Sequence, residues 1–128
     1  LKVSNFSSNH FFNLQDVCSD KYPELVFTDS NKVSVFALNG KLLYDHTFNS
    51  VIDQQPSFYR FSASEQAIGI TETATSRIFL IDSRGQVIKG FPLKGKTRFS
   101  IGYLRPGQEK FSLIVGGDEQ YLYNYNLN

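Results

Sequence analysis

The sequence predicts an all-β chain assembled from about three copies of a four-stranded antiparallel unit. Composition supports the fold class, because twelve Phe and seven Tyr supply the whole aromatic share of 15%, and Phe, Tyr, Val and Ile favour strands. An internal repeat supports the architecture, because strand-like segments and glycine turns recur about every 44 residues. The best helical candidate, residues 62–70, contains Gly69 and lacks a convincing apolar stripe. With 128 residues, 41% of them hydrophobic, the chain is long enough for one domain with a buried core.

The repeat is clearest in a hairpin that contains a glycine turn. Residues 32–41 (KVSVFALNGK) match residues 77–86 (RIFLIDSRGQ) at an offset of 45, and residues 122–128 (LYNYNLN) match the first copy at an offset of 89. Gly40 and Gly85 occupy the same place in the turn, where glycine tolerates the positive φ angles of tight hairpins. Each copy of the hairpin therefore predicts two strands joined by a tight turn.

The strand before each hairpin recurs as well. Residues 24–29 (ELVFTD) align with residues 113–118 (LIVGGD) at the same offset of 89, and residues 67–71 (AIGIT) form the middle copy. This alignment places Asp29 and Asp118 at one repeat position. We interpret both as turn residues that bond their own backbone, in preference to a functional ring of carboxylates.

Two further elements complete the unit. One follows each glycine turn, at residues 41–48 and 86–93, and residues 1–6 resemble the same element. The other precedes each pair of strands, at residues 11–14, 58–61 and 98–103. Four antiparallel strands that repeat every 40–50 residues or so are typical of the blades of a β-propeller.

The predicted organisation is one partial β-propeller domain over residues 1–128. Its parts are the last strand of a preceding blade (1–6), a first blade (10–48), a second blade (57–93) and an incomplete third blade (98–128). A β-sandwich is the alternative fold. Because a propeller ring needs at least about four blades, we expect the partner to be further blades of the same polypeptide or a second copy, which would make a homodimer.

The hairpins resemble the repeats of quinoprotein-like and integrin-type β-propellers. The residues that carry the resemblance are 36–41 (FALNGK), 80–87 (LIDSRGQV) and 89–93 (KGFPL). They look most like the propeller-like C-terminal regions of large, poorly characterised exported proteins from Bacteroidetes. The resemblance implies a fragment of a longer exported protein that is periplasmic, outer-membrane-associated or extracellular. It implies no quinone cofactor, because the chain lacks the Trp residues of the quinone-dependent members.

An acidic segment, residues 16–24 (DVCSDKYPE), resembles the calcium loop of integrin-type blades. The carboxylates at positions 1, 5 and 9 of that loop are present as Asp16, Asp20 and Glu24, so these three residues are the candidate metal ligands. Calcium requires six to eight hard oxygen ligands on a tightly turned loop. Cys18 at position 3 and Lys21 in place of glycine depart from the pattern, so a polar turn derived from such a loop is the favoured interpretation.

The C-terminal strand carries a tyrosine at every second position. Tyr121, Tyr123 and Tyr125 are expected to share one strand face, because strand side chains alternate between faces. Such a row can bind a sugar or a peptide, and it can equally pack against a neighbouring blade. We favour packing and retain the three residues as a candidate binding surface.

Other chemistries have little support in the sequence. A net charge of +1 offers no excess of positive charge for nucleic acid. No apolar run approaches the roughly 18 residues of a membrane-spanning helix. Cys18, His10 and His46 show no spacing that predicts a nucleophilic pair or a zinc site.

The expected function is that of a non-catalytic propeller segment, serving as a protein-interaction module or a structural scaffold without a cofactor. A glycan-binding propeller module is the alternative. The second alternative is a part of a propeller enzyme whose active site lies elsewhere.

Overall fold

The computed structural model describes residues 6–127, which form eleven β-strands and two short 3-10 turns and contain no α-helix. The strands make three separate antiparallel sheets of four, four and three strands. The prediction of an all-β chain with three antiparallel units is therefore confirmed. In the described residues, no helix has the length and hydrophobicity that crossing a membrane requires.

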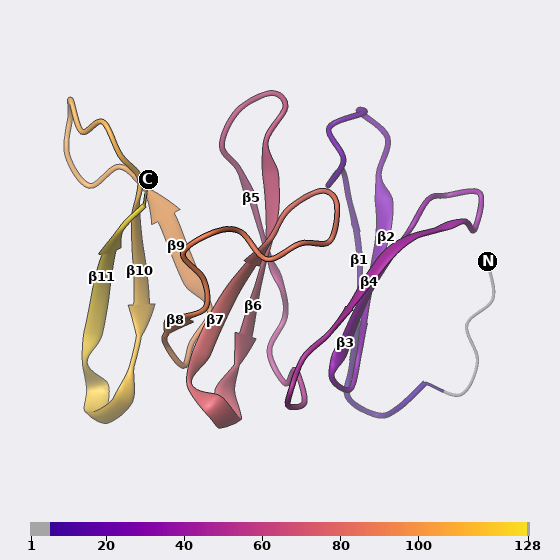
Figure 1. Cartoon of the computed structure of the whole chain (residues 1–128), viewed down its shortest axis with the longest axis horizontal. Coiled ribbons are helices and arrows are strands. Elements are labelled where there is room, and N and C mark those ends of the chain that lie inside the picture. Colours follow the sequence, from indigo (N-terminus) through magenta and orange to yellow (C-terminus); the bar gives the residue numbers. More distant parts are fainter. Residues whose placement is uncertain (1–5, 128) are drawn as a thin grey trace.

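Each sheet is a meander in which consecutive strands are neighbours (Figure 1). Sheet 1 consists of β1 (His10–Gln15), β2 (Glu24–Asp29), β3 (Lys32–Phe36) and β4 (Leu42–Thr47). Sheet 2 consists of β5 (Ser57–Arg60), β6 (Gln66–Glu72), β7 (Arg77–Ile81) and β8 (Leu93–Lys94). Sheet 3 consists of β9 (Phe99–Gly102), β10 (Ser112–Gly116) and β11 (Leu122–Asn126).

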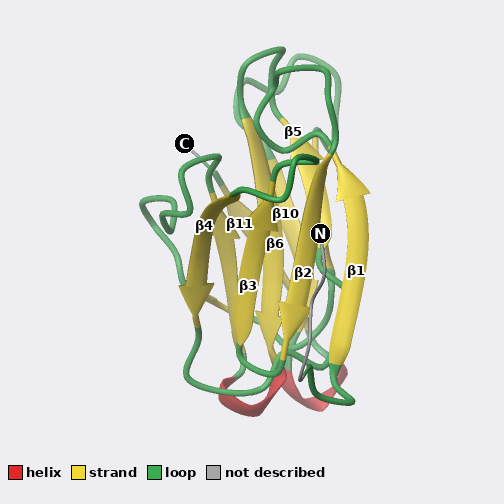
Figure 2. Cartoon of the chain, turned by 90° about the vertical axis from the view of Figure 1, so that its right-hand side faces the viewer, coloured by secondary structure: helices red, strands yellow, loops and turns green. Residues whose placement is uncertain are grey.

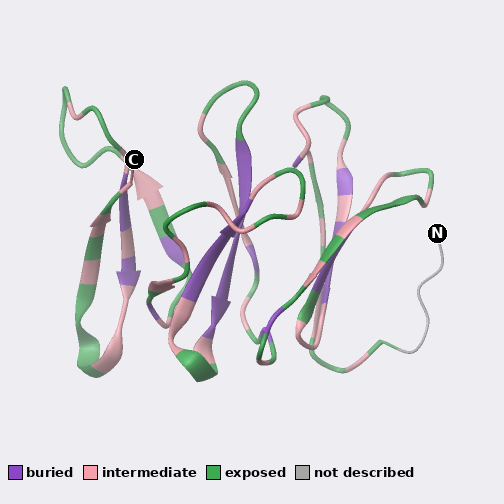
Figure 3. Ribbon diagram, viewed as in Figure 1, coloured by how far each residue is buried: buried purple, intermediate pink, exposed green. Residues whose placement is uncertain are grey.

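The three sheets lie side by side in sequence order (Figure 1). Apolar side chains fill the two spaces between them. The first interface, between sheets 1 and 2, is built around Val26, Val33 and Val35 on one side and Ile68, Ile70, Phe79 and Ile81 on the other. The second interface, between sheets 2 and 3, joins Ala67, Ile78 and Leu80 to Phe99, Leu113 and Val115. All seven residues of β6 are buried, since sheet 2 is covered on both faces (Figure 3).

The repeated hairpins have the same hydrogen-bonded turn. Gly40 and Gly85 have φ angles of 92° and 84°, in the left-handed region that favours glycine. The amide of Ala37 donates to Lys41, and the amide of Asp82 donates to Gln86, 45 residues further on.

The strand predicted over residues 86–93 is wrong for most of its length. Only an isolated bridge between Ile81 and Val87 and the two-residue strand β8 pair with β7. Gly90 has a φ angle of 99°, and Pro92 has no amide hydrogen to donate to a ladder. The chain consequently leaves the sheet between Ile88 and Leu93.

The ungapped alignment of residues 24–29 with 113–118 is also wrong, by one residue. The last residue pair before the turn is Asp29 with Lys32 in sheet 1 and Glu72 with Arg77 in sheet 2. At the equivalent position of sheet 3, the amide of Gly117 donates to the carbonyl of Tyr121. Glu72 is therefore the structural counterpart of Asp29. Asp118 lies in a turn beyond the strand, because the third turn differs in length from the first two.

The strand predicted at residues 1–6 lies outside the described residues except for Phe6. That residue is not in a strand. It packs on sheet 1, with its ring centroid 6.0 Å from that of Phe27.

Candidate functional site

The acidic turn after β1 brings its three carboxylates together. Asp16, Asp20 and Glu24 each offer an oxygen atom, and these atoms lie within 4.8 Å of one another. Lys21, at the glycine position of the calcium pattern, has a φ angle of 69°. The sixth position of the turn therefore has the left-handed backbone conformation of the calcium pattern, although lysine replaces the glycine there.

The carboxylates of this turn accept hydrogen bonds from the turn's own backbone. Asp16 accepts from the amides of Asp20 and Lys21, at 3.3 and 3.0 Å. Glu24 accepts from the amides of Val17 and Cys18, at 2.8 and 3.1 Å. These bonds close the turn through its own backbone, and calcium binding stays the less favoured of the two hypotheses.

Electrostatics in the turn keep the thiol of Cys18 protonated. Partial burial, together with the nearby carboxylate of Glu24, raises the pKa of Cys18 to about 11. A nucleophilic cysteine needs the opposite shift, toward a thiolate near neutral pH. His10 and His46 lie opposite Asp29 and Val33 in the ladders, on opposite faces of sheet 1.

Two of the three C-terminal tyrosines face sheet 2. Tyr123 and Tyr125 are half-buried and pack against the core of the second interface. The hydroxyl of Tyr125 donates to the carbonyl of Lys94 at 2.9 Å. Tyr121 precedes β11 and is 63% exposed. The row therefore contributes to packing, and its role as a binding surface stays a prediction.

Sheet 1 presents an apolar outer face on the side away from sheet 2, which faces the viewer in Figure 2. The outer face is defined by alternate residues of the first three strands: Phe12, Leu14, Leu25, Phe27 and Phe36. Phe12 and Leu14 are 48% and 63% exposed. Exposed apolar patches of this kind are typical of surfaces that contact another protein, a membrane or a ligand.

At the first interface, the chain that leaves β4 is fixed to sheet 2 by two contacts. Phe48 is buried against Phe79, with ring centroids 5.0 Å apart. The next amide, that of Asn49, donates to the carboxylate of Glu72 at 2.7 Å, and the amide of Ser50 donates to the same oxygen at 3.2 Å. We call this pair of contacts, an aromatic ring and a carboxylate at the end of the second strand, the linker anchor.

The linker anchor recurs on the outer face of sheet 1. Phe6 packs against Phe12 and Phe27, with ring centroids 6.2 and 6.0 Å away. The amide of Ser7 donates to Asp29 at 2.9 Å, and its hydroxyl donates to the same oxygen at 2.5 Å. The anchor on sheet 1 therefore consists of Phe6, Ser7 and Asp29. These residues correspond in turn to Phe48, Asn49 and Glu72, which form the anchor on sheet 2.

The junction between sheets 2 and 3 is fixed differently. Gly117 occupies the position that Asp29 and Glu72 occupy in the other two sheets, so this position has no carboxylate. The amide of Lys96 donates to the carbonyl of Gly116 at 2.7 Å. The ammonium group of Lys96 reaches Asp118 at 2.6 Å, which holds the pKa of that carboxyl below its usual value. A backbone bond and a surface ion pair thus take the place of the buried carboxylate.

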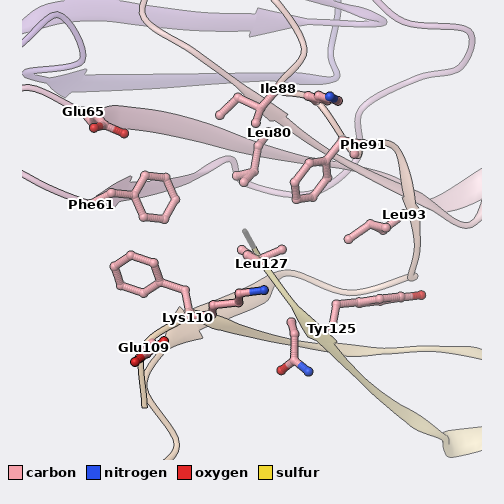
Figure 4. Close-up of a pocket in the computed structure, with 14 residues that line it drawn as sticks. Phe61, Glu65, Leu80, Ile88, Phe91, Leu93, Glu109, Lys110, Tyr125 and Leu127 are labelled. Carbon is pink, nitrogen blue, oxygen red and sulfur yellow. The ribbon is translucent and has the colours of Figure 1, made fainter. Parts of the chain in front are cut away.

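A cavity of about 420 Å³ opens at one end of the second interface (Figure 4). Its walls are apolar and come from both sheets: Phe61, Leu80, Ile88, Phe91, Leu93, Phe111, Tyr125 and Leu127. Two acids and two bases also line it, Glu65, Glu109, Lys89 and Lys110, and all four are exposed. The size lies within the range of ligand pockets, roughly 300–1,000 Å³.

Comparison with known proteins adds no family assignment. No protein-family model matches the sequence, and no curated protein matches it. The functional argument therefore depends on the fold and on the contacts described above.

Sequence reasoning missed the linker anchor and the cavity. The anchor has a signal, because Phe6 and Phe48 are 42 residues apart and each precedes a polar residue whose amide is captured. The cavity has a weaker signal, the Gly90 and Pro92 pair inside an expected strand. Its shape depends on side chains from two sheets, which no local pattern reports.

Proposed function

We propose that this chain is a non-catalytic segment of a β-propeller that serves as a structural scaffold or protein-interaction module. In this proposal the outer face of sheet 1 is covered by a further four-stranded unit, from the same polypeptide or from a second copy. Meander sheets that stack in sequence order are the arrangement of propeller blades. The resemblance to exported Bacteroidetes proteins supports a place in the cell envelope or outside the cell.

The recurrence of the linker anchor on the outer face carries this proposal. At the first interface the anchor joins one sheet to the next. Phe6, Ser7 and Asp29 repeat it on a face whose apolar side chains are exposed. A face that already holds the linker contacts of a neighbouring unit is expected to hold that unit too.

Several observations favour a scaffold over an enzyme. The thiol of Cys18 has a raised pKa, and the two histidines lie on opposite faces of sheet 1. Glu65 and Glu109 are exposed at the edge of the cavity, and they lack the burial that prepares a carboxyl group to act as a general acid. The glycan-binding alternative gains no support from Tyr123 and Tyr125, which are engaged in packing.

Sedimentation analysis over a range of protein concentrations tests the proposal. We expect the chain to self-associate through the outer face, and we expect Phe12→Asp to shift the population toward monomer by placing a charge there. Leu104→Asp, at a loop residue that is 59% exposed, is the matched control and is expected to change nothing. A wild-type chain that stays monomeric at every concentration would refute covering by a second copy and leave only further blades of the same polypeptide.

A further inference from the structure

The two repeated glycine turns use different residues to bind the same backbone amide. In the second turn, Oδ1 of Asp82 accepts from the amide of Gln86 at 3.0 Å. Ala37 holds the place of Asp82 in the first turn. There the amide of Lys41 donates instead to Oδ1 of Asn39, at 2.9 Å. The first turn therefore depends on a side-chain amide that directly precedes its glycine.

The surroundings of the two turn glycines differ as well. A Cβ atom on Gly85 would overlap the ring of Tyr44, which lies directly against that turn. A Cβ atom on Gly40 would meet no atom within 4 Å outside the adjoining residues. Asn39 is itself exposed. The peptide bond between Asn39 and Gly40 therefore lies in open space, where a ring can form on it and water can reach it.

An asparagine followed by glycine carries both reacting groups of an intramolecular reaction. The backbone nitrogen of the glycine attacks the side-chain carbon Cγ of the asparagine, and the ring that forms is a succinimide. A side chain on the second residue hinders this attack, and glycine has none. Because both groups belong to neighbouring residues, their effective concentration is high. The bond from the amide of Lys41 to Oδ1 of Asn39 also draws electrons away from Cγ, which favours the attack.

We propose that Asn39 is a site of spontaneous deamidation, with the backbone nitrogen of Gly40 as the nucleophile and water as the only co-reactant. The nitrogen of Gly40 bonds Cγ of Asn39, and the bond from Cγ to Nδ2 breaks. The proton of the Gly40 amide passes through solvent to the departing group, which leaves as ammonia. Water then opens the succinimide. Opening at Cγ gives aspartate at position 39, and opening at the main-chain carbonyl gives isoaspartate.

The structure directs this reaction to Asn39 in preference to the other asparagines. The amide of Gly40 donates to the carbonyl of Ala37 at 2.9 Å, but this bond lies at the tip of a hairpin, where local opening costs little. Asn49 is the next candidate, and the nitrogen that would attack it is held more firmly. That nitrogen belongs to Ser50, and its amide donates to the buried carboxylate of Glu72 at 3.2 Å. The other described asparagines precede larger residues: Asn9, Asn13, Asn31, Asn124 and Asn126.

The two products have different consequences for the hairpin. Aspartate keeps an oxygen that accepts from the amide of Lys41, and it adds a negative charge at the turn. Isoaspartate puts an extra carbon atom into the backbone, so it lengthens the turn and disturbs the bond from the amide of Ala37 to the carbonyl of Lys41. The equivalent turn of sheet 2 has Arg84 in place of Asn39 and cannot react in this way. Deamidation therefore modifies one of two otherwise equivalent turns, and it does so independently of how the outer face of sheet 1 is covered.

Peptide mapping by mass spectrometry of the whole folded chain, aged in mildly alkaline buffer, tests this site. We expect Asn39 to lose its side-chain amide before any other described asparagine, with both aspartate and isoaspartate as products. The loss is expected to be faster at higher pH, because the attacking nitrogen must give up its proton. The same chain in denaturant is the reference. An Asn39 that reacts in denaturant and stays intact in the folded chain, or an Asn49 that reacts first, would overturn the proposal.

Two variants separate the predicted chemistry from general ageing of the chain. Asn39→Gln keeps a side-chain amide, but its reaction requires a larger ring that forms less readily, so we expect the loss at residue 39 to disappear. Asn49→Gln is the matched control, because it changes an exposed asparagine elsewhere in sequence, and the loss at residue 39 is expected to continue at the wild-type rate. An amide loss at residue 39 that is equally fast in Asn39→Gln would show direct hydrolysis by water and refute the role of Gly40.

Discussion

The first interface is closed by Tyr44, whereas the second interface, built from copies of the same strands, keeps a cavity. The segments that link consecutive sheets are also fixed by different contacts. Glu72 fixes the first linker with a fully buried carboxylate, and the second linker relies on backbone bonds and an exposed pair between Lys96 and Asp118. Equivalent positions in a repeat thus perform the same structural task with different chemistry.

The comparison separates the constrained strands of the repeat from the less constrained ones. The central strands of sheet 2, β6 and β7, must stay apolar, because both of their faces are buried between sheets. The strand at the edge of a sheet is less constrained, and in sheet 2 it departs from the ladder at residues 89–92 without disturbing β6 and β7. Sequence variation at edge strands therefore changes the surface of the protein while the packing of the three sheets is retained.

The largest effect is expected from a substitution that creates a cavity in the first interface. We expect Tyr44→Ala to lower the free energy of unfolding by about 3 kcal/mol, because it creates a second cavity in a packed cluster. Ile88→Ala is expected to cost only about 1 kcal/mol, since its surroundings already lack packing partners on one side. Urea denaturation of both variants measures the difference.

Tyr44→Phe separates packing from hydrogen bonding in that experiment. The Tyr44 hydroxyl is buried without a hydrogen-bond partner in the described part of the chain, and burial raises the pKa of Tyr44. Removing the hydroxyl while keeping the ring is expected to leave stability unchanged or slightly higher. Equal losses for Tyr44→Ala and Ile88→Ala would show that the two interfaces are packed alike.

The buried carboxylate of the first linker predicts a pH dependence. Burial alone would raise the pKa of Glu72, but hydrogen bonds from Thr75, Asn49 and Ser50 and the nearby Arg77 outweigh burial and hold the pKa below 4.5. A carboxyl group whose pKa is lower in the folded state stabilises the fold above its unfolded pKa, and this stability is lost as the pH falls through the folded pKa. We expect the wild type to lose stability below pH 4.5.

Glu72→Gln isolates this contribution. We expect it to cost about 2 kcal/mol at neutral pH, because the amides it caps lose a charged acceptor. The variant's stability should then fall less steeply than that of the wild type when the pH is lowered. Parallel pH profiles from thermal unfolding would contradict the role assigned to Glu72.

The smallest expected effect is at the acidic turn, which belongs to the better-packed half of the stack. Lys21 has a left-handed φ angle of 69°, so Lys21→Gly is expected to raise the free energy of unfolding by about 0.5 kcal/mol. Millimolar calcium is expected to leave the melting temperature of the wild type unchanged, because Asp16 and Glu24 already accept backbone amides. A calcium-dependent rise in melting temperature would instead support a metal site.

The repeat made most of the fold predictable. The hairpins around Gly40 and Gly85 depend on local turn chemistry and on a strand pattern of period two, and both are visible in the sequence. The departure at residues 89–92 was not predicted, because the apolar residues of this segment are typical of a strand and only Gly90 and Pro92 disfavour one.

The candidate sites were less predictable than the strands. The grouping of Asp16, Asp20 and Glu24 follows from their spacing in one short turn. The pairing of Glu72 with the linker amides, and its equivalence to Asp29, depend on turn lengths that shift the alignment by one residue. One residue of shift moves a side chain to the opposite face of a sheet, so sequence offsets alone could not assign these roles.

Amide hydrogen exchange at Ser7 tests most directly whether the outer face of sheet 1 is built as an interface between units. The account predicts that the Ser7 amide, like that of Asn49, is protected, and that Asp29→Ala removes the protection at Ser7 while leaving Asn49 unaffected. Exchange of the Ser7 amide at the rate of an unstructured peptide in the wild type would contradict it.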